Sequence, residues 1–217
     1  MLIQNDPPEN AGSRAPFYHK YPPVLLVLVG SIISVSLVQF LATPELEDGL
    51  LRAGALLDRG QYDHVQRPFG PYASYVLHTF LHGGVLHLGM NMWVLLSFGA
   101  VIAMALGGSA RGIAAFLAFF FFCAIGGAAA QDVLFQFQVE GGYAIGASSA
   151  ISGLLPALGW LQGRWRRAIR ISLPWVVINL GLAVFGHLSP IAIAWAAHLG
   201  GLAAGFAFPL FFRWTRG

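Results

Sequence analysis

Residues 113–130 read IAAFLAFFFFCAIGGAAA, an apolar run without a single charged residue. A helix that crosses a lipid bilayer needs about 20 predominantly apolar residues. Five more runs share this character, at residues 24–41, 76–106, 147–161, 171–185 and 191–212. The sequence therefore predicts an all-α fold, a polytopic membrane bundle with six transmembrane helices.

The overall composition agrees with a membrane environment. The 217 residues are 57% hydrophobic and only 10% charged, whereas soluble domains average about 25% charged residues. So few charges cannot cover a surface that faces water, and we expect the lipid bilayer to be the main solvent. We expect residues 1–22, which are polar and rich in proline, to form a cytoplasmic tail, and residues 23–217 to form one transmembrane domain.

The distribution of charge predicts the orientation. Nine of the twelve Lys and Arg residues fall on one side of the six-span frame: Arg14, Lys20, Arg111, Arg164, Arg166, Arg167, Arg170, Arg213 and Arg216. The other side holds the remaining three and seven of the nine acidic residues. Cytoplasmic loops carry an excess of Lys and Arg, so we expect both termini in the cytoplasm of a bacterium, with the protein in its inner membrane. Basic residues at span ends are an orientation signal, and we expect no nucleic-acid partner.

The second, fourth and sixth apolar runs carry His, Asn and Ser side chains, which are costly in lipid and so mark candidate functional sites. The second run holds His82, His87 and Asn91, and the last two lie four residues apart on one helical face. The fourth opens with Gly146-Ala147-Ser148-Ser149, and the sixth contains Ala197-His198 followed by Gly201.

These polar groups are predicted to share one depth. Ser148 lies 15 residues before Gly163, where the basic cytoplasmic loop starts, and His198 lies 15 residues before Arg213. At about 1.5 Å per residue, both lie roughly 22 Å above the cytoplasmic face. Asn91 reaches the same level if the second span ends at residue 106.

A hydroxyl and an imidazole at one depth suggest nucleophilic catalysis. A serine hydroxyl is a weak nucleophile at neutral pH and needs an adjacent base, which His198 can supply to Ser148. The last three spans hold no acidic residue, so the prediction is a Ser–His dyad with the imidazole oriented by packing. Asn91, His87 and the Ser148 backbone N–H can donate hydrogen bonds to an oxyanion. Water can reach the site because the fourth run is short and can begin below the outer surface.

Taken in order, the motifs His82-x4-His87-x3-Asn91, Gly146-Ala147-Ser148 and Ala197-His198-x2-Gly201 resemble those of the rhomboid family of intramembrane serine proteases. The resemblance covers residues 76–208. It implies Ser148 as nucleophile, His198 as general base, His87 and Asn91 as oxyanion donors, and His82 as a structural or water-binding group. It implies membrane-anchored protein substrates cut near the outer, periplasmic face, with no metal and no cofactor.

The sequence departs from the family pattern near the nucleophile. Ser149 stands where the family has glycine, and Ser152 stands where an aromatic ring usually stacks on the base. Ala73-Ser74 replaces the Trp-Arg pair that is common before the second span. With Gly146 and Gly201, Ser149 belongs to the supporting set of small residues around the site.

Several alternatives stay open from the sequence. Ser149 or Ser152 could be the nucleophile, and a catalytically impaired relative could bind transmembrane segments without cutting them. The histidines at 78, 82 and 87 also suggest a His-rich metal-handling membrane protein. Otherwise, we expect His78 to bond at the outer interface and Asn179 to make an interhelical hydrogen bond.

Overall fold

A computed structural model describes residues 21–58, 65–137, 142–185 and 193–217. Residues 1–20 of the predicted tail lie outside this part. The elements in chain order are α1 (Pro23–Phe40), α2 (Pro44–Gly54), β1 (Leu56–Leu57), α4 (Ser74–Leu77), the 3₁₀ helix η2 (His78–Phe80), α5 (Val85–Leu106), α6 (Ala110–Phe135), β2 (Tyr143–Ala144), α7 (Ser148–Ser152), α8 (Leu154–Phe185), α9 (Trp195–Gly205) and α10 (Phe208–Trp214).

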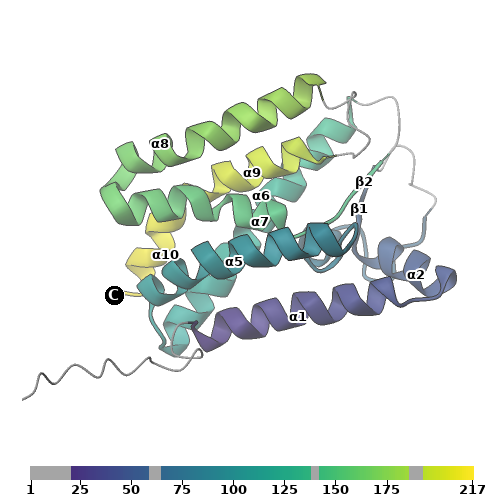
Figure 1. Cartoon of the computed structure of the whole chain (residues 1–217), viewed down its shortest axis with the longest axis horizontal. Coiled ribbons are helices and arrows are strands. Elements are labelled where there is room, and N and C mark those ends of the chain that lie inside the picture. Colours follow the sequence, from purple (N-terminus) through teal and green to yellow (C-terminus); the bar gives the residue numbers. More distant parts are fainter. Residues whose placement is uncertain (1–20, 59–64, 138–141, 186–192) are drawn as a thin grey trace, which may run out of the picture.

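The predicted helical membrane bundle is confirmed (Figure 1). The strands add only a short antiparallel pair, in which Leu56 faces Ala144 and Leu57 faces Tyr143. This pair ties the segment that follows α2 to the segment that precedes α7.

Among the described residues, four helical segments are long and apolar enough to cross a membrane, and α9 with α10, bent by 42°, would make a fifth. One of the four, Ser148–Phe185, is 38 residues long. At 1.5 Å per residue it would extend about 57 Å, nearly twice the hydrocarbon thickness of about 30 Å. Figure 1 shows that α8 turns back on itself, and we expect its two legs to be separate passes. The total of six spans rests on this division and stays a prediction.

The turn in α8 has a local cause. Gly163 and Arg164 leave helical geometry, and Arg164 adopts a positive φ of 58°. On either side of the turn, the two legs approach closely: a Cβ at Gly159 of the first leg would lie 2.5 Å from the Cα of Ala168 of the second. The Arg164 guanidinium lies 4.2 Å from the centre of the Trp160 ring. A basic turn of this kind favours an aqueous boundary over hydrocarbon.

The second span begins later than the sequence suggested. The predicted run at 76–106 is divided into α4, η2, an extended segment and finally α5, which starts at Val85. Gly84 has a φ of 135°, which L side chains rarely adopt. The segment before it is fixed by α1 instead, because the Gln39 side chain accepts from the His82 N–H at 2.9 Å and donates to its carbonyl at 3.1 Å.

Charge separates the two ends of the bundle. The start of α1, the α5–α6 connection, the turn of α8 and the C-terminus lie at one end, on the left of Figure 1. The Arg-rich turn and the last helix, with Arg213 and Arg216, bring basic residues to this end. At the opposite end, α2 carries Glu45, Glu47 and Asp48.

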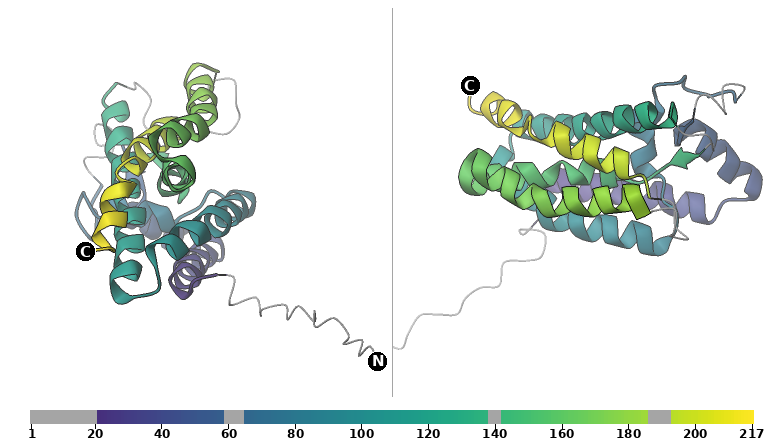
Figure 2. Two further views of the ribbon diagram at one scale, coloured as in Figure 1. Left: turned by 90° about the vertical axis from the view of Figure 1, so that its left-hand side faces the viewer. Right: turned by 90° about the horizontal axis from the view of Figure 1, so that it is seen from above.

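Helix α6 lies side by side with α9, as the views in Figure 2 show. Gly126, Gly127 and Gly200 permit this approach, since a Cβ at 200 would lie 2.5 Å from the Gly126 carbonyl oxygen. Nearer the start of α6, Phe119 is fully buried and its ring packs against Phe208 and Phe211 of α10. The small residues in the second half of α6 therefore let α9, which carries His198, approach closely.

Candidate active site

The structure brings Ser148 and His198 together. The Ser148 hydroxyl oxygen lies 2.8 Å from Nε2 of His198, within hydrogen-bonding distance. Ser148 is the first residue of α7 and is half-buried, whereas His198 belongs to α9 and is 8% exposed. The chain enters α7 through Gly146, whose φ of 117° suits only glycine.

Small residues make this pairing of α7 and α9 possible. A Cβ at Gly201 would overlap the carbonyl of Ser149, and a Cβ at Gly205 would overlap the carbonyl of Gly153. Close backbone contact of this kind is typical of membrane helices that carry small residues at the interface. Gly201, one of the small residues expected around the site, therefore lies at the contact between α7 and α9.

The second nitrogen of His198 also has a partner. Its Nδ1 lies 2.9 Å from Oδ1 of Asn179, a fully buried residue on the second leg of α8. The predicted interhelical hydrogen bond of Asn179 is thus present, but it is made to the His198 ring. The His198 imidazole is therefore held by the Asn179 amide as well as by packing. The prediction of a Ser–His dyad did not include this amide.

An aromatic ring covers the imidazole, although Ser152 replaces the aromatic residue expected on α7. The Trp175 ring lies 5.5 Å from the His198 ring, centre to centre, at an interplanar angle of 33°. Its Nε1–H donates to the Ser152 hydroxyl at 3.0 Å. Sequence reasoning missed Trp175, because the replacement comes from a different span.

His87 and Asn91 lie on α5, beside the loop that carries the nucleophile. A Cβ at Gly146 would lie 2.9 Å from Nε2 of His87 and 3.7 Å from the Ser148 hydroxyl oxygen. The Gly83 N–H donates to Nδ1 of His87 at 3.3 Å, so Nε2 carries the proton of the neutral ring. One turn along, the Asn91 side-chain amide donates to the His87 carbonyl at 2.8 Å.

His82 is fully buried and lies outside helix α5. Its Nδ1 is 2.9 Å from the Ser36 hydroxyl oxygen, and its ring is 5.1 Å from the His87 ring, centre to centre. Among the described residues, no side chain or backbone group bonds its Nε2. A buried polar atom in this position is suited to binding a water molecule.

A second Ser–His pair lies behind the first. Nε2 of His78 is 3.0 Å from the Ser149 hydroxyl oxygen, and its Nδ1 is 2.8 Å from the Ser74 carbonyl. Both His78 and Ser149 are 2% exposed, so the expectation that His78 bonds at the outer interface is wrong. The Gly146 N–H also donates to the His78 carbonyl at 2.8 Å. His78 thereby anchors the loop on both sides of Ser148.

The predicted metal-handling alternative finds no support in the part of the chain that the structure describes, where no three His, Cys, Asp or Glu side chains are grouped to hold a metal ion.

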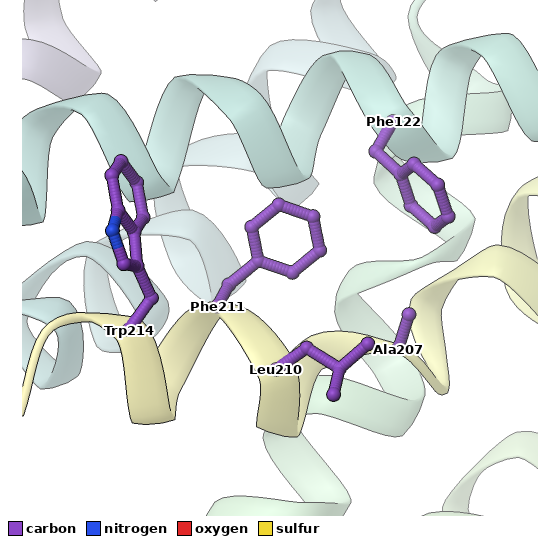
Figure 3. Close-up of a pocket in the computed structure, with 5 residues that line it drawn as sticks. All are labelled: Phe122, Ala207, Leu210, Phe211 and Trp214. Atoms are coloured by element: carbon purple, nitrogen blue, oxygen red, sulfur yellow. The ribbon is translucent and has the colours of Figure 1, made fainter.

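An open apolar hollow of about 270 Å³ lies between α6 and α10 (Figure 3). It is lined by Phe122, Ala207, Leu210, Phe211 and Trp214. With no polar group among these side chains except the Trp214 indole N–H, it offers little for catalysis.

The fold and the paired side chains define a class: a multi-pass helical membrane protein in which separate helices bring a hydroxyl to an imidazole. A family model described as Rhomboid domain matches residues 70–215, which is well over half of the chain. The chain belongs to the rhomboid family, whose members are generally intramembrane serine proteases that act on membrane proteins. No curated protein matches the chain.

Proposed function

We propose that this protein is an intramembrane serine endopeptidase that cleaves membrane-anchored proteins near the outer face of the membrane. The observation that carries the proposal is the 2.8 Å contact between the Ser148 hydroxyl and Nε2 of His198. A nucleophile and a base within hydrogen-bonding distance are what covalent catalysis by serine requires.

In the proposed reaction, the Ser148 hydroxyl oxygen attacks the carbonyl carbon of the scissile peptide bond while Nε2 of His198 takes the hydroxyl proton. The tetrahedral oxyanion accepts hydrogen bonds from Nε2–H of His87, from the Asn91 side-chain amide and from the Ser148 N–H. The imidazolium then protonates the leaving amine, the C–N bond breaks and an ester to Ser148 remains. Water, deprotonated by His198, hydrolyses this ester and restores the serine.

The location of the pair supports this assignment. Ser148 is half-buried, so a substrate backbone can reach it, and α7 is a short helix at the start of a longer membrane segment. Glycine and small residues surround it. We place this end of the bundle at the periplasmic face and both termini in the cytoplasm, because the opposite end carries the Arg-rich turn of α8.

Labelling with a fluorophosphonate probe tests the proposal. The purified full chain in detergent should react covalently, and Ser148→Ala should abolish the reaction, as should His198→Ala. Ser97→Ala is the matched control, because Ser97 is on α5 and its hydroxyl donates to the Trp93 carbonyl of its own helix. Full labelling of Ser148→Ala would refute the assignment of the nucleophile.

The His78–Ser149 pair favours a second assignment of the nucleophile, since its geometry is similar. Its burial argues against it, because a substrate cannot reach atoms that are only 2% exposed without displacing α6 or η2. Ser149→Ala should therefore still label, while its melting temperature falls because His78 loses a buried partner. A wild-type chain that binds transmembrane segments but does not label would instead be a catalytically impaired relative.

A further inference from the structure

The orientation of the Asn179 side chain is set by its own helix. Its Nδ2 donates to the Trp175 carbonyl, one turn earlier on α8, at 2.8 Å. The amide nitrogen is therefore on that side, and Oδ1 is the atom that faces His198, 2.9 Å from Nδ1 of the ring. This hydrogen-bond network assigns the oxygen and the nitrogen of the amide.

The amide oxygen in turn determines the tautomer of His198. A carbonyl oxygen can only accept a hydrogen bond, so Nδ1 of the neutral imidazole must carry the proton. Nε2 then presents its lone pair, and this is the atom 2.8 Å from the Ser148 hydroxyl. Only this tautomer can take a proton from the serine, since a ring protonated at Nε2 has no free electron pair there.

A second contact fixes the plane of the ring. The Trp175 ring faces His198, and its Nε1–H donates to the Ser152 hydroxyl at 3.0 Å. The Ser152 hydroxyl donates to the Ser148 carbonyl at 2.7 Å, so the indole is attached to the helix of the nucleophile. The second leg of α8 therefore makes two contacts with the His198 imidazole: Asn179 bonds its Nδ1, and Trp175 packs on the face of its ring.

We propose that Asn179 is a positioning residue that holds His198 in the Nδ1-protonated tautomer, so that the unit is Ser148–His198–Asn179, with Trp175 covering the ring. This rests on the proposed function for its catalytic consequence. The tautomer itself follows from the hydrogen bonds alone, and it can be measured whether or not the protein cleaves a substrate.

The first measurement is ¹⁵N NMR of histidine-labelled wild-type protein in detergent, with the His198 signals assigned by their absence from His198→Gln. We expect a protonated Nδ1 and an unprotonated Nε2. A wild-type His198 protonated at Nε2 would overturn the proposal without any substitution at Asn179. If the wild type shows the expected tautomer but never reacts with a fluorophosphonate, the proposed function fails while the assignment of the tautomer stands.

The second measurement compares variants by their rates of fluorophosphonate labelling. Asn179→Leu removes the acceptor and should slow labelling about tenfold, the factor that corresponds to one neutral hydrogen bond. It should also shift His198 toward the Nε2-protonated form. Asn179→Asp keeps an acceptor and should retain most of the rate. Rapid labelling of Asn179→Leu with an unchanged tautomer would contradict the proposal.

Ser172→Ala provides the matched control. Ser172 lies two turns before Asn179 on the same leg of α8 and is also buried. Its hydroxyl has no hydrogen-bond partner among the residues that the structure describes. Neither the labelling rate nor the His198 tautomer should change in this variant. A change as large as that of Asn179→Leu would show that any loss of a polar group in α8 has this effect, and would overturn the specific role of Asn179.

Discussion

Gly201 on α9 lies directly against Ser149 on α7, so closely that a Cβ at position 201 would overlap the Ser149 carbonyl. Ser149 follows Ser148, and Gly201 is three residues beyond His198, about one turn of α9. The separation of the two helices at this contact therefore sets the distance between hydroxyl and imidazole. Backbone contact between α7 and α9, and not only the choice of side chains, determines the geometry of the pair.

The first prediction is that Gly201→Ala inactivates the protein. The added methyl group must push α9 away from α7, which costs about 1–3 kcal/mol of stability and lengthens the contact between Ser148 and His198. We expect a lower melting temperature in detergent and a large loss of fluorophosphonate labelling at temperatures where the protein is still folded. Gly30→Ala on α1 is the control, because a Cβ there meets open space, and it should label normally.

The second prediction concerns the oxyanion. Asn91 uses one N–H of its amide to bond the His87 carbonyl, and the second N–H stays available to a substrate. Asn91→Ala should lower kcat for a model transmembrane substrate by roughly 10²–10³, with little change in KM, because the interaction exists mainly in the transition state.

Asn91→Asp separates the loss of a donor from a loss of packing. The carboxylate has nearly the same size as the amide but no N–H, and it repels an oxyanion. It should lose as much activity as Asn91→Ala. Wild-type kcat in either variant would exclude Asn91 from the oxyanion site and leave His87 and the Ser148 N–H as the donors.

The fold was largely predictable because each membrane helix shows itself as an apolar run. The sequence located α1 and α6 to within a few residues, and it anticipated that the chain turns back near the arginines after Gly163. It placed the start of the second span too early, since residues 76–84 are also rather apolar. The start of α5 is decided by the backbone angle at Gly84 and by two hydrogen bonds between His82 and Gln39 of α1, which no local sequence pattern reveals.

The candidate site was predictable only in part, for a similar reason. Ser148 and His198 could be paired from their depth, because depth in a helix is a simple count of residues. The environment of His198 depends on which side chains of the second leg of α8 face α9. The sequence indicated that Asn179, an amide in an apolar run, makes an interhelical hydrogen bond, but it did not indicate which residue is the partner. Nothing in the sequence pointed to Trp175 except that Ser152 stands where an aromatic residue was expected.

The third prediction tests the orientation and the number of spans together, using cysteine substitutions and a membrane-impermeant maleimide in intact spheroplasts. The chain has a single native cysteine, Cys123, which is fully buried and should not react. Tyr143→Cys lies between α6 and α7, at an exposed position on the predicted outer side, and should react directly. Gly108→Cys, between α5 and α6, should react only after permeabilisation.

Two further positions decide between six passes and fewer. Arg166→Cys lies just after the turn of α8 and Gly217→Cys lies at the C-terminus, and both are exposed. If each leg of α8 crosses the membrane, both positions face the cytoplasm and stay unlabelled until the membrane is opened. If the two legs together made only one crossing, every later segment would be inverted and Gly217→Cys would react in intact spheroplasts. The proposed proteolysis needs Ser148 and His198 near the outer ends of the fourth and sixth passes. An inverted last pass would put His198 near the cytoplasmic face, so such a result would also remove the outer-face site on which the proposal depends.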